Sequence, residues 1–223
     1  MTPSSGSEAR AVHEGQAVYG ALLLHGYNAV VFGINYRAFW RCSPQQVVDL
    51  YERNITDEHL DIGVGTGYLL TRCSPSARRR IALADLNPHS LRHTAAQLAG
   101  YQVTCHRADA LKPLPLPRAS FGSVGLNFLL HCLPGPLSAK AAALDHAAAC
   151  LYPGGRLFGS TVLAHGVPVT PAGRRLMAHF NRRGIFHNAA DSLDDLRDQL
   201  AARYTAFHLT THGSVALFEA VVE

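Results

Sequence analysis

The chain has 223 residues, which is long enough for one domain with a sizeable core and too short for two domains with separate cores. Hydrophobic residues make up 48% and charged residues 16%, which excludes extensive disorder, and only the polar residues 1–15 are expected to be disordered. The net charge of +4 comes mainly from scattered arginines, with one short cluster at 78–80, which argues against a nucleic-acid partner.

The cysteines and the apolar segments predict a cytoplasmic protein. Five cysteines are widely spaced and form no C-x-x-C pair, as expected for reduced thiols. The most apolar early stretch, 21–34, is interrupted by polar residues, so no membrane anchor is expected. No H-x-x-x-H or clustered-carboxylate pattern accompanies the histidines of residues 176–187, so no metal site is predicted. Both a monomer and a homodimer remain open.

From residue 59 onward, short apolar runs alternate with helical patterns, which is typical of repeated strand–helix units in a mostly parallel sheet. The predicted strands are 59–62, 81–84, 103–106, 123–127 and 156–161, and the predicted helices are 67–73, 88–99, 138–151 and 191–204. A substrate-side insertion is expected at about 165–190, because the segment is too long for a simple connection. Two alternating runs around His212-Gly213-Ser214 predict a terminal antiparallel hairpin.

The most informative stretch is His59-Leu-Asp-Ile-Gly-Val-Gly-Thr-Gly-Tyr68, where a strand runs into three glycines spaced G-x-G-x-G. Glycine at Gly63, Gly65 and Gly67 allows a sharp turn and lets a ligand approach the main chain. Asp61 precedes them, where a carboxylate attracts an ammonium or a sulfonium and repels a pyrophosphate. The loop therefore predicts a cationic ligand.

Asp85 ends the second predicted strand, where a carboxylate can accept hydrogen bonds from both hydroxyls of a ribose. Alone, Asp85 and Asn87 fit equally well as helix caps ahead of Pro88. Together with the glycine loop, Asp85 favours a nucleoside ligand.

These motifs are joined by Asp109-Ala110 after the third strand, Asn127 in the fourth, and Leu151-Tyr-Pro-Gly-Gly155 before the fifth. In this order they resemble the class I methyltransferases over roughly residues 27–223. The resemblance implies an α/β fold, a Rossmann-like seven-stranded, mostly parallel sheet with helices on both faces and a C-terminal antiparallel hairpin.

The resemblance assigns residues 59–223 to this domain. It implies transfer of a methyl group from S-adenosyl-L-methionine to a small-molecule substrate, with S-adenosyl-L-homocysteine as product. The cofactor-binding residues it implies are Asp61, Gly63, Gly65, Thr66, Gly67, Asp85, Leu86, Asp109, Ala110 and Asn127. In family terms Asp109 would bind the adenine amino group, although an acid there is also an ordinary helix cap.

Residues 16–58 are expected to form a helical lid over the cofactor. Tyr36 and Trp40 lie four apart on a predicted helix, where their rings could pack beside a sulfonium. A helix that docks on the sheet instead is at least as compatible with this pattern. Tyr27 and Arg37 are candidate substrate contacts.

Two residues on the expected substrate side carry tentative roles. His131, just past the fourth strand, is a candidate general base and substrate contact, although a histidine there could merely satisfy a loop carbonyl. Arg182 could hold an anionic group of the substrate, with a solvent-exposed arginine as the simpler alternative.

The main alternative is a protein that binds S-adenosylmethionine without transferring the methyl group, as a regulatory module or as a catalyst of a rearrangement. A nucleotide-dependent oxidoreductase is disfavoured, because G-x-G-x-x-G is missing and Asp61 would be unexplained.

Overall fold

The structure is a computed structural model that describes residues 38–74, 76 and 79–223. The predictions for residues 1–15, Tyr27, Tyr36 and Arg37 lie outside the described residues, as does most of the expected lid. Within the described residues, no helix is both long and apolar enough to cross a membrane. In that same part of the chain, no three side chains of the metal-binding types are grouped to hold an ion.

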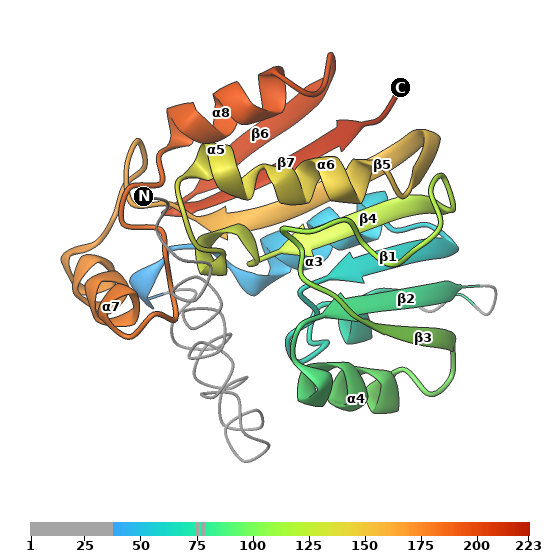
Figure 1. The fold of residues 1–223 in the computed structure, drawn as a ribbon. Coiled ribbons are helices and arrows are strands. Elements are labelled where there is room, and N and C mark those ends of the chain that lie inside the picture. The colour runs from blue at the N-terminus through green and yellow to red at the C-terminus, as the bar shows by residue number, and fades with distance from the viewer. Residues whose placement is uncertain (1–37, 75, 77–78) are drawn as a thin grey trace, which may run out of the picture.

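The described residues form a seven-stranded sheet in the order β3-β2-β1-β4-β5-β7-β6 (Figure 1). Its strands are β1 (Glu58–Ile62), β2 (Arg80–Asp85), β3 (Gln102–Arg107), β4 (Phe121–Asn127), β5 (Leu151–Val162), β6 (Phe207–His212) and β7 (Val215–Val221). The first five pair in parallel, and β7 pairs antiparallel with both β5 and β6. The predicted sheet and terminal hairpin are confirmed. Because the strand order reverses between β1 and β4, their carboxyl ends flank the crevice where such sheets bind ligands.

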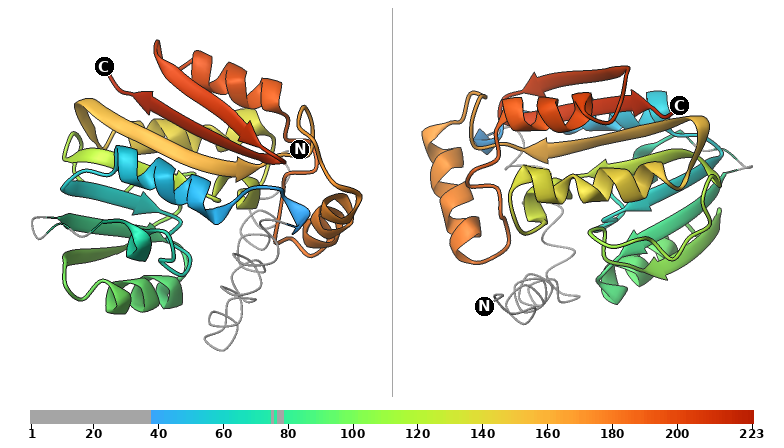
Figure 2. Two further views of the ribbon diagram at one scale, coloured as in Figure 1. Left: turned by 180° about the vertical axis from the view of Figure 1, so that it is seen from behind. Right: turned by 45° about the horizontal axis from the view of Figure 1, so that its top comes forward.

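Helices cover both faces of the sheet (Figures 1 and 2). On one face lie α3 (Pro44–Asn54) and α4 (Pro88–Gln97), and on the other lie α5 (Leu137–Lys140), α6 (Ala142–Ala148) and α8 (Leu193–Ala201). Strand β2 shows how alternation divides the core, because Ile81 and Leu83 pack toward α3 and α4 while Ala82 and Ala84 pack into the opposite cluster. The sheet is therefore apolar on both faces, and its polar side chains collect at the strand ends.

The helix starts follow from local capping. The Ser43 side chain accepts from the Gln45 main-chain N–H, and Ser43 forms a capping box with Gln46 at the start of α3. Ser192 caps α8 by accepting from the Asp195 main-chain N–H at 3.0 Å. Pro88 occupies the first turn of α4.

Two helix predictions were wrong. Residues 67–73 contain only the short 3-10 helix η2 (Leu70–Arg72), because Gly67 takes a positive φ of 71°, outside the helical region. The helix predicted at 138–151 divides into α5 and α6, and Leu151 begins β5 because it pairs with Phe121 in the sheet. Within the insertion at about 165–190, the structure adds helix α7 (Pro171–Arg182).

Helix α3 packs on the sheet and belongs to the main domain. Its residues Val47, Leu50 and Tyr51 are buried in the same apolar cluster as Leu83. Residues 44–54 therefore dock on the sheet. The lid expected from the residues before them stays a prediction.

Candidate active site

The three glycines of the loop after β1 have two different roles, close packing within the protein and access for a ligand. Positive φ angles occur at Gly63 (75°), Gly65 (55°) and Gly67 (71°). A Cβ at Gly63 would lie 2.8 Å from Leu129 Cδ1, and one at Gly67 would lie 2.7 Å from Thr94 Cγ2. A Cβ at Gly65 would meet no atom within 4 Å. Gly63 and Gly67 thus permit close packing, whereas Gly65 leaves space open.

That space belongs to a cavity of about 240 Å³ at the carboxyl ends of the central strands. The cavity is lined by the glycine loop, by the segments that follow β2, β3 and β4, and by part of the insertion. Its lining includes Asp61, Thr66, Asp85, Leu86, Asp109, Ala110, Asn127, His131, Cys132, Gly184, Ile185 and His187. All ten predicted cofactor residues from Asp61 to Asn127 line this cavity.

Asp61 is held at the floor of the cavity by a partner that the sequence did not reveal. The hydroxyl of Tyr51 in α3 donates to Asp61 Oδ2 at 2.6 Å, and both groups are buried. Burial and the Asp61 charge raise the pKa of Tyr51 well above its usual range, so the phenol keeps its proton and remains a donor. The second carboxylate oxygen can then face a ligand while the first fixes the orientation.

The Asp85 carboxylate accepts hydrogen bonds from two different loops. Its Oδ1 accepts from the Asn87 main-chain N–H at 2.8 Å, and its Oδ2 lies 3.4 Å from the Gly65 main-chain N–H, which donates to it. Burial raises the pKa of this carboxyl to about 6. An acceptor for hydroxyl groups therefore stands beside the open space at Gly65.

Asp109 both caps a turn and lines the cavity. Its Oδ1 accepts from the Leu111 main-chain N–H at 3.0 Å, as in the helix-cap alternative. Lys112 Nζ lies 3.8 Å from Oδ2. Asn127 has an unused donor, since Nδ2 is buried and finds no acceptor among the described residues, while its Oδ1 accepts from Ser160 at 3.0 Å.

His131, in the 3-10 helix η3 (Leu130–Cys132), is buried against the ring of Phe186. The Val162 main-chain N–H donates to His131 Nδ1 at 3.3 Å, so Nδ1 carries a lone pair and Nε2 carries the proton. Burial, together with the charge of Lys140, lowers the pKa of His131 to about 3. The structure therefore argues against the prediction that His131 is a general base and leaves it as a hydrogen-bond donor.

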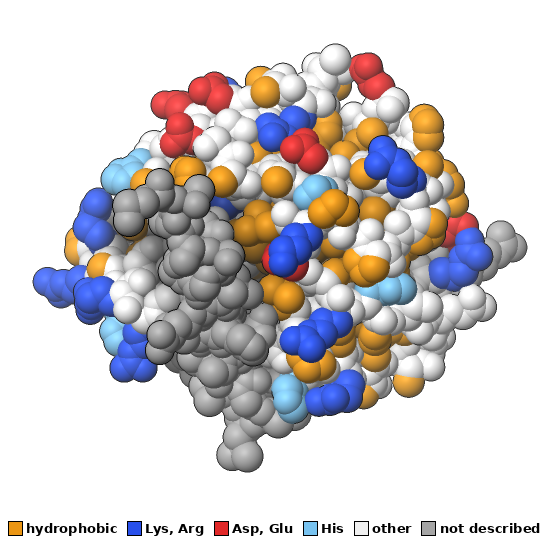
Figure 3. All heavy atoms as spheres, in the orientation of Figure 1, with side chains coloured by type: hydrophobic (Ala, Val, Ile, Leu, Met, Phe, Trp, Pro, Cys, Tyr) orange, Lys and Arg blue, Asp and Glu red, His pale blue; other side chains and the backbone are white. Residues whose placement is uncertain are grey.

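Two other predicted residues lie away from the cavity wall. Trp40 is 3% exposed and packs in the core, with its ring centroid 6.2 Å from that of Phe186. It lies at a bend, so it cannot present an aromatic face from a helix to the cofactor. Arg182 ends α7 and is exposed, in the region of α7 where basic side chains gather at the surface (Figure 3). The simpler alternative, a solvent-exposed arginine, holds for Arg182.

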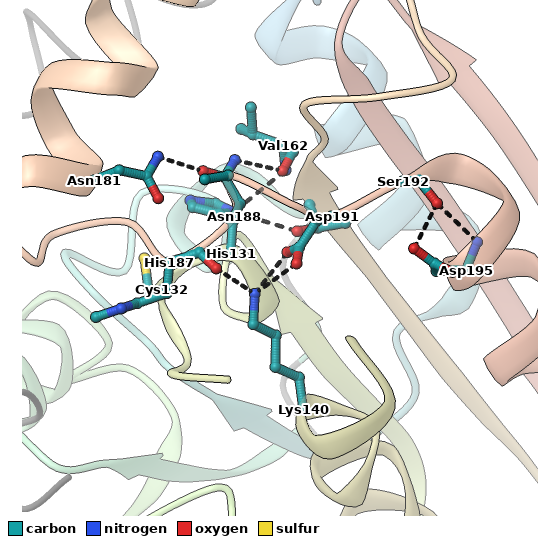
Figure 4. A network of polar contacts seen from close by, with 12 residues as sticks. His131, Cys132, Lys140, Val162, Asn181, His187, Asn188, Asp191, Ser192 and Asp195 are labelled. Carbon is teal, nitrogen blue, oxygen red and sulfur yellow. Dashed lines mark hydrogen bonds and ion pairs between the residues drawn. The ribbon is translucent and has the colours of Figure 1, made fainter. Parts of the chain in front are cut away.

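A buried network behind the cavity was missed by the sequence analysis (Figure 4). Lys140 Nζ donates to Asp191 Oδ1 at 2.8 Å, to Asp191 Oδ2 at 2.7 Å and to the His187 carbonyl at 2.8 Å. The His187 N–H donates to the His131 carbonyl at 2.7 Å. These bonds fasten the insertion to α5 and η3. The one signal in the sequence is that Lys140, one of few lysines, stands among apolar helix residues.

Comparisons with known proteins agree with this geometry. A family model described as a methyltransferase domain matches residues 60–157. Demethylluteothin O-methyltransferase of Streptomyces thioluteus is 48% identical over 94% of this chain and 91% of its own length. A physcion biosynthesis cluster O-methyltransferase of Aspergillus chevalieri is 34% identical over 93% of this chain and 94% of its own. The crystal structure of an S-adenosylmethionine-dependent methyltransferase of Thermotoga maritima has the same fold, with a TM-score of 0.66 at 14% identity, covering 96% of this chain and all (100%) of that one.

The residues present fit S-adenosylmethionine. Gly65 leaves a cradle that a side chain would fill, Asp85 offers a carboxylate beside it, and Asn127 retains an unpaired donor. The similarity to named methyltransferases also removes the alternative of a binding protein without transferase activity. The chain is thus a member of the class I S-adenosylmethionine-dependent methyltransferases, an enzyme that methylates a small molecule.

Proposed function

We propose that the methyl acceptor is a hydroxyl oxygen of a small molecule. The observation that carries the proposal is that the glycine loop and two histidines, His131 and His187, line the same cavity. A neutral histidine can orient a hydroxyl by donating a hydrogen bond to it, and one with a free lone pair can deprotonate it. The name of the relative that is 48% identical, demethylluteothin O-methyltransferase, supports the same acceptor atom.

Three carboxylates divide the recognition of the cofactor in this proposal. Asp85 accepts hydrogen bonds from the ribose hydroxyls, and Asp61, fixed by Tyr51, attracts the ammonium of the amino-acid part. Asp109 and Ala110 lie where the adenine would bind. Each negative charge then faces a donor or a cation, which suits a ligand with a net positive charge.

Besides binding the cofactor, the protein must align the acceptor oxygen with the methyl group and exclude water. S-adenosylmethionine supplies a methyl group on a positively charged sulfur, so the enzyme needs no nucleophile of its own. His131 presents Nε2–H as a donor that can orient an acceptor oxygen, and Phe186 packs on its ring at a centroid distance of 4.3 Å. The ring is therefore held in one orientation.

The test is to incubate the protein with demethylluteothin and S-adenosylmethionine labelled with ¹³C in the methyl group. We expect a product with one added methyl, whose ¹³C shift identifies a methyl bound to oxygen. A product labelled on nitrogen or carbon, or no product from a protein that binds the cofactor, would contradict the proposal.

The same proposal places the protein in the cytoplasm without a nucleic-acid partner. All five cysteines are free thiols, as a reducing compartment maintains.

Asp85→Asn is expected to weaken S-adenosylmethionine binding by about 10- to 100-fold, because hydrogen bonds to a charged acceptor contribute about 1.5–3 kcal/mol. The raised pKa of about 6 adds a pH dependence. As pH falls through about 6, Asp85 takes up a proton and loses acceptor capacity, so affinity should fall in the wild type and stay level in Asp85→Asn. Calorimetric titration between pH 5 and pH 8, about the range that brackets this pKa, measures both effects. Equal affinity of the two proteins at pH 8, about two units above it, would refute the ribose assignment.

A further inference from the structure

The main-chain N–H and carbonyl of His187 are both hydrogen-bonded, and the residue lines the cavity. It belongs to the segment between α7 and α8 and lines the cavity with Gly184 and Ile185. Its N–H donates to the His131 carbonyl at 2.7 Å, and its carbonyl accepts from Lys140 Nζ at 2.8 Å. Figure 4 shows the ring extending away from Lys140. The main-chain position of His187 is therefore set by bonds that do not involve its ring nitrogens.

The two ring nitrogens of His187 differ in role. One hydrogen-bonds the Gly184 carbonyl, and since a carbonyl only accepts, that nitrogen carries the proton. The other nitrogen of the neutral ring then holds a lone pair. Burial, followed by the charge of Lys140, lowers the pKa of His187 below its usual range, so the neutral form prevails at pH 7. A neutral imidazole with a lone pair is the state that a proton acceptor requires.

The other titratable groups at this end of the cavity do not offer such a lone pair. His131 uses Nδ1 to accept from the Val162 main chain and has its proton on Nε2. Burial raises the pKa of the Cys132 thiol to about 12, so it stays protonated. Asp191 is committed to Lys140. Asp85 faces the same cavity from the cofactor side.

We propose that His187 is the proton acceptor for the hydroxyl that receives the methyl group. This role rests on the proposed function. The hydroxyl proton moves to the free ring nitrogen of His187, and an oxygen lone pair forms the new O–C bond. The electron pair of the broken C–S bond returns to sulfur, which becomes a neutral thioether. The imidazolium then releases its proton to solvent, which restores the starting state.

The test compares His187→Gln with His179→Gln, a matched change of an exposed histidine on α7. The main-chain bonds that anchor His187 survive the substitution. With demethylluteothin as acceptor, we expect kcat of His187→Gln to fall by about 10²- to 10⁴-fold, the usual contribution of a general base. Affinity for S-adenosylmethionine should stay within about threefold of the wild type, a change of less than about 0.7 kcal/mol. In the wild type, kcat should rise with pH as the ring loses its proton below its usual range and then level off, and His187→Gln should lose this rise.

A second readout needs no acceptor. In the ¹⁵N-histidine-labelled protein without ligands, the ring signal that is missing from His187→Gln should titrate below the usual histidine pKa of about 6.5, with one nitrogen protonated at neutral pH. If the wild type makes no product, the proposed acceptor fails, and the titration still decides whether the His187 ring is neutral with a lone pair at neutral pH. Turnover of His187→Gln within about threefold of wild type, or a ring that is doubly protonated at about pH 7, would overturn the proposal.

Discussion

Lys140→Met is expected to lower the free energy of unfolding by about 3–5 kcal/mol, because removing one partner of a buried ion pair leaves an uncompensated charge. Lys140 is 0% and Asp191 2% exposed, and Nζ lies 2.7 Å from the nearer carboxylate oxygen. Methionine is unbranched and only one atom shorter than lysine, so the loss reports mainly on the charge and its hydrogen bonds. Urea denaturation at neutral pH measures the change.

Two control variants distinguish the effect of burying an unpaired charge from the effect of losing an ion pair. Lys140→Met/Asp191→Leu removes both charges and should be more stable than Lys140→Met alone. Arg197→Met breaks the exposed pair with Asp194, which has an N–O distance of 2.6 Å, and should change stability by less than about 1 kcal/mol. A loss of less than about 1 kcal/mol in Lys140→Met would contradict the view that this pair fastens the insertion.

Gly65→Leu is expected to weaken S-adenosylmethionine binding by about 100-fold or more, because the side chain would occupy the cavity beside Asp85. Overfilling a site costs about 1–3 kcal/mol, equivalent to about 5- to 150-fold in affinity, and direct overlap with the ligand lies at the upper end. Calorimetric titration measures the affinity.

Gly154→Leu is the matched control. Gly154 also has a positive φ, 80° against 55° at Gly65, and a Cβ there likewise meets nothing within 4 Å. It lies outside the cavity lining. Both variants should therefore lose similar stability through backbone strain, of about 1–2 kcal/mol. Equal affinity of Gly65→Leu and Gly154→Leu for the cofactor would show that the open space at Gly65 is not the binding site.

The sequence was sufficient to predict the parts of the site that depend on local spacing. The glycine loop, Asp85 and Asp109 follow strand ends, and strand ends are marked by apolar runs that stop at small or acidic residues. Because parallel strands bring their carboxyl ends to one edge, order along the chain also predicts proximity in space. The cofactor side of the cavity could therefore be predicted from the sequence.

The parts that depend on long-range packing could not be predicted in this way. Tyr51 reaches Asp61 from α3 only because that helix docks on the sheet, and Lys140 meets Asp191 across 51 positions of the chain. The choice between His131 and His187 depends on which ring nitrogen a main-chain group occupies, and no pattern of residue types encodes this. Trp40 shows the converse, since its aromatic spacing from Tyr36 suggested a binding face where the structure has core packing.

The most direct test is calorimetric titration of the wild-type protein with S-adenosylmethionine, S-adenosylhomocysteine and NAD. The account predicts that the first two bind with one site per chain and that NAD does not bind, because Asp61 opposes a pyrophosphate at the glycine loop. Binding of NAD, or failure of a folded protein to bind either sulfur compound, would contradict the assignment of this cavity.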